Sequence, residues 1–184
     1  MTRNIIEELH VEHRTMARLL DLLDRQVSRF ERSAEPDYAL MQQIVDYFLD
    51  FPDRYHHPKE DLLAKLMIER APARAEPLRG LAGKHEELGL LTRRFQRLLQ
   101  RVLDEAELPR QQVVRAAREF IASQRYHMEG ENRDFLPLAQ EVLRAGDLER
   151  LDYELFGKQD PLQETKEGAP FAKVRDALLA GERD

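Results

Sequence analysis

Two histidine–glutamate pairs in this sequence have a spacing suited to metal coordination. His56 and Glu60 are four residues apart, and so are His127 and Glu131. Residues four apart lie on one face of an α-helix, so each pair presents an imidazole and a carboxylate in the same direction. These groups are ligands for iron, zinc, copper and manganese. We interpret each pair as two ligands offered to neighbouring metal positions.

Two further histidines occupy core positions of predicted helices, one per helix. A lone histidine on an apolar stripe is more often a hydrogen-bonded core residue than a ligand. Four histidines from four helices would rarely all face one core by chance, and burying them with two carboxylates would be costly without a shared partner. The stripe around His13 contains histidine as its only polar member, and the third-helix stripe contains His85. The first stripe comprises Ile6, Leu9, His13, Met16, Leu20, Leu23, Val27 and Phe30.

Distances along the chain place these groups at one depth of a helical bundle. His13 lies 21 residues before Ala34, in the first predicted turn, and His56 lies 22 residues after it. Around the turn near residue 108, His85 and Glu131 each lie 23 residues away. Helices that rise about 1.5 Å per residue would therefore bring these groups into a single layer.

The number of these ligands indicates two metals. Four imidazoles and two carboxylates are too many for one tetrahedral zinc site. Divided over two metals, with the carboxylates bridging, they give each metal two imidazoles and leave positions open for a small molecule. This predicts a redox-capable pair of iron ions, with manganese or zinc as alternatives, and a diatomic molecule or a peroxide as the ligand.

Two neighbouring histidines leave the ligand set open. His10 lies one turn before His13 and could coordinate instead of it or beside it, although the stripe favours His13. His57 follows His56 and could orient a ligand or face solvent. The candidate metal ligands are His10, His13, His56, Glu60, His85, His127 and Glu131.

Helical periodicity predicts an all-α fold, an up-down-up-down four-helix bundle. Apolar residues recur at helical spacing over 6–30, 38–70, 81–102 and 113–135, and short connections make neighbouring helices antiparallel. Pro52 and Pro58 predict a kink or a short break in the second helix, and Pro137 predicts the end of the fourth. The loops are expected at 33–37 and 71–77.

The chain divides into a bundle at 1–145 and a C-terminal extension at 146–184. Gly146 is expected to end the segment that follows Pro137. Two short helices, near 148–156 and 171–179, are expected to pack on the bundle, with a polar loop at 157–170 between them.

Composition excludes several classes of protein. The 184 residues include no cysteine, which excludes disulfides, thiolate metal sites and iron–sulfur clusters. The net charge of −6 argues against non-specific nucleic-acid binding, and no apolar run is long enough to span a membrane. The polar start of the chain is unlike a signal peptide, so a cytoplasmic location is expected. The oligomeric state stays open.

Tyr47, Tyr55 and Tyr126 lie near the candidate ligands in sequence. They could serve as hydrogen-bond donors or radical sites, but packing and rim positions are the favoured interpretation.

The sequence resembles the hemerythrin-like HHE cation-binding family over about residues 4–140. The resemblance implies a four-helix bundle with a non-haem di-iron site bridged by oxo or carboxylate groups. Members bind dioxygen, sense oxygen or iron, respond to nitric oxide, or help repair iron–sulfur centres. The motifs that carry it are His10-Val-Glu-His13-Arg, His56-His57-Pro-Lys-Glu60-Asp61, Lys84-His85-Glu86-Glu87 and His127-Met-Glu-Gly-Glu131-Asn, followed by Phe135-Leu136-Pro137.

The sequence departs from oxygen-carrying hemerythrins at one position. Those proteins have a second histidine one turn after the third-helix histidine, and Gly89 stands there in this chain. Reversible oxygen carriage is therefore in doubt unless His10 or His57 replaces that imidazole. One histidine per helix plus two glutamates is closer to the iron-centre repair proteins, which usually carry an additional cysteine-containing segment. The functional hypotheses are a binding or sensing protein, an enzyme that turns over peroxide or another small oxidant, and, ranked last, a metal-free structural bundle.

Overall fold

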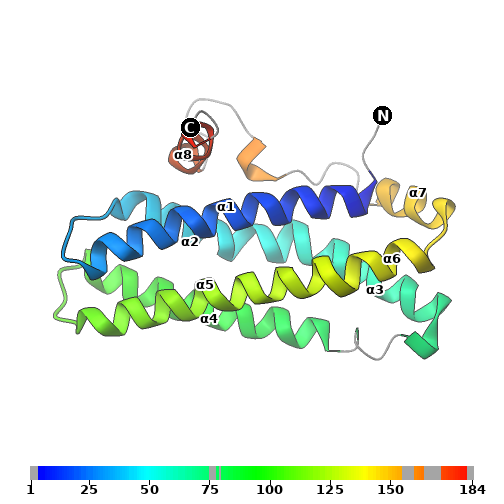
Figure 1. The fold of residues 1–184 in the computed structure, drawn as a ribbon, viewed down its shortest axis with the longest axis horizontal. Helices are drawn as coiled ribbons and strands as arrows, with labels where there is room; N and C mark the ends of the chain where they lie inside the picture. The colour runs from blue at the N-terminus through cyan, green and yellow to red at the C-terminus, as the bar shows by residue number, and fades with distance from the viewer. Residues whose placement is uncertain (1–3, 75–77, 79, 155–159, 164–170, 182–184) are drawn as a thin grey trace.

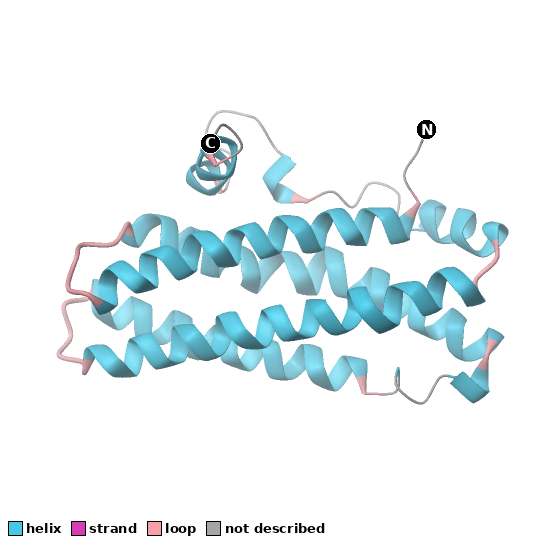
Figure 2. Cartoon of the chain, viewed as in Figure 1, coloured by secondary structure: helices cyan, strands magenta, loops and turns pink. Residues whose placement is uncertain are grey.

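The computed structural model describes residues 4–74, 78, 80–154, 160–163 and 171–181. Throughout these residues the regular secondary structure is helical (Figure 2). Long helices run side by side along the longest axis of the molecule and are joined at its ends (Figure 1). Helix α1 (Ile5–Glu31) packs against α2 (Tyr38–Phe51) and α5 (Arg110–Gly130), and α4 (Leu81–Leu103) packs against the same two helices. The predicted all-α four-helix bundle is confirmed.

Side-chain caps mark where the first two helices begin. Asn4 accepts a hydrogen bond from the backbone N–H of Glu7 at the start of α1, and Asp37 accepts one from that of Leu40 at the start of α2. Each bond satisfies a backbone donor that the first helical turn leaves without a partner. The chain turns between α1 and α2 through Ser33, whose φ of 60° is left-handed.

The α-helical pattern of the second long helix is interrupted where its prolines predict a kink or a short break. Between α2 and α3 (His57–Arg70) lies a π-helical turn, η1 (Pro52–His56), in which the His57 N–H donates to the Pro52 carbonyl. Pro58 then falls in the first turn of α3, where its missing N–H costs little. The π-turn lets the helix continue past two prolines. It also sets the direction in which His56 and His57 leave the backbone.

The fourth long helix is longer than expected. Pro137 was predicted to end it, but the helix continues through a second π-turn, η4 (Glu131–Phe135), into α6 (Leu136–Val142). The Leu136 N–H donates to the Glu131 carbonyl, so Pro137 again lies in a first helical turn. The prediction that Pro137 limits this helix was therefore wrong, because a π-turn accommodates a proline that an uninterrupted α-helix would not.

The core consists of two apolar clusters. The first surrounds the end of the bundle that holds the α1–α2 and α4–α5 connections, and the second surrounds the opposite end. The first includes Met16, Leu20, Phe48, Phe95 and Phe120. The second includes Ile5, Leu9, Leu63, Phe135 and Leu136.

The C-terminal extension packs on the bundle. In α7 (Ala145–Glu154) Leu151 joins the second apolar cluster, and in α8 (Ala172–Ala180) Val174 joins the first. Gly146 lies in the first turn of α7, whereas the preceding helix already ends at Val142, so Gly146 does not end that segment.

Two predicted loops are only partly described. The one at 71–77 begins with the 3₁₀ turn η2 (Pro72–Arg74), and the rest of it lies outside the described residues. Of the one at 157–170, the described part holds the 3₁₀ turn η5 (Pro161–Gln163) and the buried Asp160.

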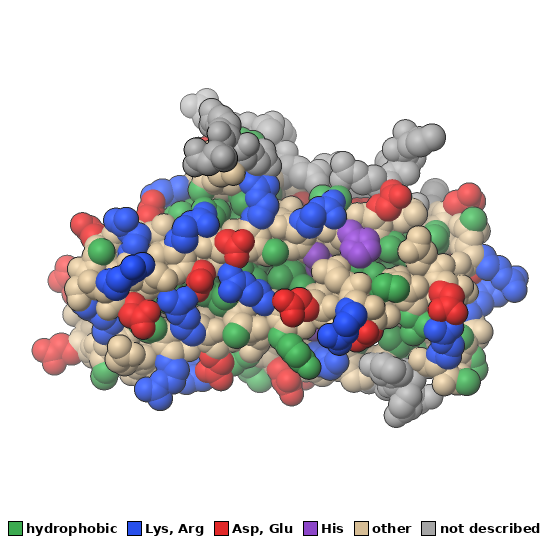
Figure 3. Space-filling model, viewed as in Figure 1, with side chains coloured by type: hydrophobic (Ala, Val, Ile, Leu, Met, Phe, Trp, Pro, Cys, Tyr) green, Lys and Arg blue, Asp and Glu red, His purple; other side chains and the backbone are tan. Residues whose placement is uncertain are grey.

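The face of the molecule shown in Figure 3 carries many charged side chains of both signs. Lys and Arg side chains alternate with Asp and Glu on the face shown in Figure 3, with no continuous basic region there. Among the described helices, none combines the length and apolar character needed to cross a membrane.

Candidate metal centre

A layer of histidine and glutamate side chains lies between the two apolar clusters. The structure brings six of the seven candidate ligands into this layer and adds His57, while His10 lies outside it. Two groups of four residues each place a potential ligand atom from every member within 4.8 Å of the others. The first group is His13, His56, Glu60 and Glu131, and the second is His57, Glu60, His85 and His127.

The first group joins α1 to both π-turns. His13 Nε2 lies 3.0 Å from His56 Nε2 and 3.4 Å from Glu131 Oε2. His56 Nε2 lies 3.3 Å from Glu60 Oε1. Two imidazole nitrogens that bind one metal at about 2.1 Å, at a right angle, would be about 3.0 Å apart. The separation of the two imidazoles therefore matches that of two ligands of a single ion.

The second group joins α3, α4 and α5. His85 Nε2 lies 3.3 Å from Glu60 Oε2, and the ring of His85 lies parallel to that of His57 at 3.7 Å between centroids. The ring of His127 stands nearly perpendicular to His85, with centroids 5.0 Å apart. Three imidazoles from three helices thus gather around Glu60 in this group.

The two glutamates connect the groups. Glu60 directs Oε1 to His56 and Oε2 to His85, each at 3.3 Å from the imidazole Nε2. Glu131 also directs its two oxygens to different groups. Its Oε2 lies 3.4 Å from His13 Nε2 in the first group, and its Oε1 lies 2.9 Å from His127 Nε2 in the second. Each carboxylate therefore presents one oxygen to each group, as a bridging ligand would.

The layer also contains polar atoms that the described part of the chain leaves without a hydrogen bond. They are both carboxylate oxygens of Glu60 and of Glu131, together with Nε2 of His85 and of His127. Glu60 has 0% of its surface exposed. Buried polar atoms nearly always have a partner, so six such atoms converging in one layer require one. Their nitrogen and oxygen chemistry fits a divalent transition metal.

Charge complementarity within the layer shifts the ionisation of its members. Burial would lower the pKa of His56, but the carboxylates of Glu60 and Glu12 outweigh it and raise that pKa to about 10. His85 follows the same balance, with a pKa of about 9 set by Glu131 and Glu60 against burial. Burial and Glu60 raise the pKa of Glu131, but three histidines around it prevail and lower it to about 2. In the metal-free protein, protons on the imidazoles therefore balance the carboxylates.

A buried network of charged residues holds His56 through Nδ1, the ring nitrogen that does not face the other ligands. Glu12 Oε2 accepts from His56 Nδ1 at 2.8 Å, and Glu12 also pairs with Lys59, which pairs in turn with Glu8 at the surface. Lys59 is only 1% exposed. A carboxylate that fixes the far nitrogen of a metal-binding histidine orients its ring and raises its basicity. Sequence reasoning missed Glu12 and Lys59, although Glu12 lies between the two histidines of the first motif.

His10 contacts the layer only indirectly. Its Nδ1 lies 3.0 Å from Asn132 Oδ1, and His13 Nδ1 lies 2.9 Å from the same oxygen. His10 is partly exposed and belongs to neither group. The structure therefore places His13 with its Nε2 in the layer and His10 beside the amide that holds His13.

The tyrosines near the site take packing and rim positions. Tyr47 is buried, stacks on Phe51 and donates its hydroxyl to Asp160 at 3.1 Å. Tyr55 stacks on the other side of Phe51, and Tyr126 is 77% exposed. Asp160 links the C-terminal extension to this aromatic cluster.

The fold and the site together define a metal-binding four-helix bundle. The family model described as Hemerythrin HHE cation binding domain matches residues 4–139. The chain belongs to this family, because the match covers most of its length and all residues of the layer. Searches of curated proteins and of solved structures found no match.

Proposed function

We propose that the layer holds two iron ions, one in each group of side chains. His13 and His56 would bind one ion, and His57, His85 and His127 would bind the other. Glu60 and Glu131 would bridge the pair. The observation that carries this proposal is that Glu60 is shared by both groups and directs a different oxygen into each.

A carboxylate-bridged iron pair would supply reversible redox chemistry and open coordination for a small ligand. The protein binds or senses dioxygen, nitric oxide or a peroxide, or handles iron, through this centre. The surrounding residues suit that role. Apolar clusters lie on both sides of the layer, and Glu12 holds His56 in position.

The count of imidazoles supports a small-ligand centre. Where oxygen-carrying relatives have a second third-helix histidine, this chain has Gly89, but His57 lies in the second group and contributes an imidazole from α3. Five histidines and two glutamates are thus available. The first metal position would have two imidazoles and the second would have three.

The test combines iron content with spectroscopy. Protein loaded with iron should develop an absorption spectrum that changes once, stoichiometrically, when dioxygen, nitric oxide or hydrogen peroxide is added. A chain that binds only zinc from iron-supplemented cells would contradict the redox proposal. Variants lacking Glu60 should lose the spectrum.

The alternative function is an enzyme that turns over peroxide or another small oxidant. A cavity that opens to the surface and is lined by His127 and Glu131 favours this alternative, because it gives a substrate access to the centre. Sustained consumption of peroxide at a constant rate would indicate the enzyme, whereas a single stoichiometric reaction would indicate the binding protein.

A further inference from the structure

A cavity of about 630 Å³ lies between α4 and the long helix formed by α5, η4 and α6. At one end its wall includes His127 and the buried side chain of Glu131, which we propose as metal ligands. Exposed Tyr126 also lines it and marks the opening to solvent. The cavity therefore runs from the surface to the second group of ligands.

The cavity is too large for the small ligands considered above. A water molecule occupies about 30 Å³ in the liquid, so the cavity has room for about twenty of them, whereas a diatomic molecule needs one or two such volumes. Ligand pockets for organic molecules typically measure about 300–1,000 Å³. The volume fits an organic molecule.

Most of the cavity wall is hydrocarbon. Leu81, Leu88 and Leu91 line it from α4, and Phe135 and Leu138 line it from the opposite helix. Burying hydrocarbon against such side chains is favourable in proportion to the area removed from water. The wall therefore selects an apolar body.

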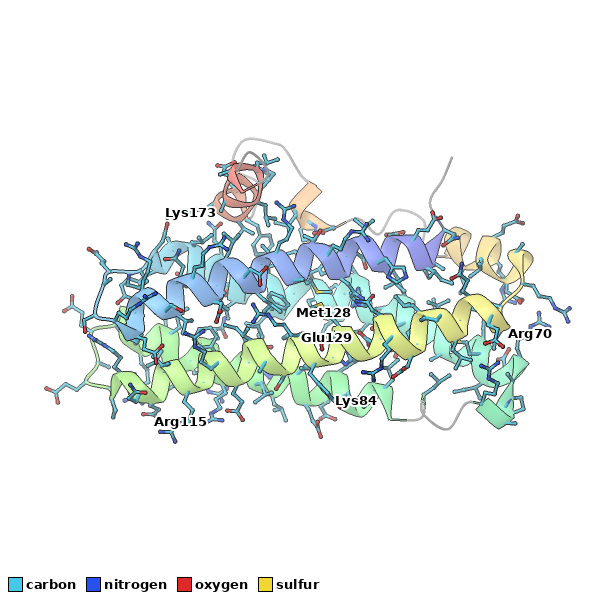
Figure 4. The ribbon with its side chains drawn as sticks, viewed as in Figure 1. Arg70, Lys84, Arg115, Met128, Glu129 and Lys173 are labelled. Carbon is cyan, nitrogen blue, oxygen red and sulfur yellow. The ribbon has the colours of Figure 1, made fainter. Side chains whose placement is uncertain are left out.

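The polar side chains that line the cavity differ in exposure: Lys84, Glu87, Arg133 and Asp134 are exposed, whereas Glu131 is buried. Near the opening lie Lys84 and Glu87 of α4 and the ion pair between Arg133 and Asp134, so the formal charges there cancel. Figure 4 labels Lys84 on α4, in the part of that helix below α5. At the inner end, His127 Nε2 and the Glu131 oxygens lack a hydrogen bond among the described residues. A neutral opening and a polar inner end suit a ligand whose polar head enters first.

We propose that this cavity binds an organic molecule with a hydrocarbon body and a terminal oxygen-donor head. A medium-chain carboxylate and an alkyl hydroperoxide share this chemistry. The head reaches His127 and Glu131, and the body lies along the leucines. This inference rests on the proposed metal centre, because His127 and Glu131, which the head reaches, are among the residues that would hold the metal.

Two glycines provide a matched pair of variants. Gly130 lines the cavity, and a Cβ placed on it would meet nothing within 4 Å. Gly83 in α4 also has open space at its Cβ but does not line the cavity. Both have helical backbones, so each Gly→Leu change is expected to favour the helix similarly. Gly130→Leu fills the cavity, and Gly83→Leu serves as the control.

The experiment measures binding of decanoate and acetate to the iron-loaded full-length protein by calorimetry, with the iron content of every sample determined. Decanoate should bind at least about 100-fold tighter than acetate, because its eight additional methylene groups enter the leucine-lined wall. Gly130→Leu should weaken decanoate at least about tenfold and leave acetate unchanged. Gly83→Leu should change neither.

Equal affinity of the unmodified protein for decanoate and acetate would overturn the inference, as would unchanged decanoate binding in an iron-replete Gly130→Leu variant. Should that variant lose iron, Ala122→Phe takes its place, since Ala122 lines the cavity five residues from His127. Weakened decanoate binding in Ala122→Phe supports the inference, and unchanged binding overturns it. An unmodified protein without iron contradicts the metal centre itself, and is distinguished from these outcomes by its iron content.

Discussion

His57 lies flat against His85, with the ring centroids 3.7 Å apart and the ring planes 4° from parallel. Its Nδ1 faces Asp53 Oδ1 at 3.2 Å, which leaves Nε2 for the second group of ligands. Burial lowers the pKa of His57, and the positive charges of His85 and His56 lower it further, to about 3. The ring is therefore neutral near pH 7, the form in which imidazole binds a metal.

Removal of this ring should cost one metal. In His57→Ala we expect the second position to lose most of its affinity while the first is retained, since His57 belongs to the second group alone. Metal titration followed by elemental analysis measures this. His57→Ala with two tightly bound ions would show that His57 only packs against His85.

The pair His10 and His13 gives a second, opposite prediction. His13→Ala should lower the metal content, because His13 Nε2 lies in the first group, whereas His10→Ala should leave it unchanged, because His10 belongs to neither group and contacts Asn132. The same elemental analysis applies to both variants. Greater metal loss from His10→Ala than from His13→Ala would reverse the assignment.

The network behind His56 can be tested by single and double variants. Glu12→Gln removes the buried negative charge that pairs with Lys59 and strengthens the hydrogen bond from His56 Nδ1, so we expect about 3 kcal/mol less stability and metal affinity about 10–100-fold weaker. Adding Lys59→Met should restore much of the stability, because it removes the buried unpaired charge. It should not restore the metal affinity, because His56 still lacks the Glu12 carboxylate. Thermal melts and metal titrations separate the two effects. The exposed Glu7 in the same helix provides the control, Glu7→Gln.

Metal-free protein should lose stability in alkali. The pKa values of His56 and His85 are raised to about 10 and about 9. The stability that these two protonated histidines contribute is therefore complete below their unfolded-state pKa of about 6.5. It is lost as the pH rises through 9 to 10. The pKa of Glu131 is lowered to about 2, so its effect on stability has the opposite pH dependence. The stability that the Glu131 carboxylate contributes is lost as the pH falls below about 4.5.

The melting temperature of metal-free protein should therefore fall between pH 7 and pH 10. Metal-loaded protein should be much less affected over this range, because its imidazoles are already deprotonated when they bind. A metal-free melting temperature that stays constant from pH 7 to pH 10 would contradict the charge arrangement of the layer.

The sequence predicts the bundle and much of the layer because both depend on helical period. Apolar stripes define the faces of the helices, and a histidine such as His13 can be placed on a stripe by counting. The π-turns could not be predicted in this way. They add a residue to a helical turn at His56 and Glu131, which rotates the residues that follow. His57 follows the first π-turn directly and lies three residues before Glu60, and it reaches the second group.

The residues that support the candidate ligands could not be predicted from the sequence either. Lys59 looks like a surface residue between His57 and Glu60, yet it is buried against Glu12 from another helix. Such a pairing depends on how α1 and α3 meet, and helical period does not specify that. Prolines mislead for a similar reason, since Pro137 is tolerated only because η4 precedes it.

Removing Glu60 should have a different effect from removing any one histidine, because Glu60 is proposed to bridge both metal positions. Because its two oxygens face different groups, Glu60→Ala should weaken both metal positions. His85→Ala should weaken only the second, since an imidazole nitrogen binds one metal. The central claim is thus tested most directly by iron bound per chain at saturation in the unmodified protein, Glu60→Ala and His85→Ala. We predict two ions, close to none, and one, respectively. A single ion in the unmodified protein, or two ions retained by Glu60→Ala, would contradict the account.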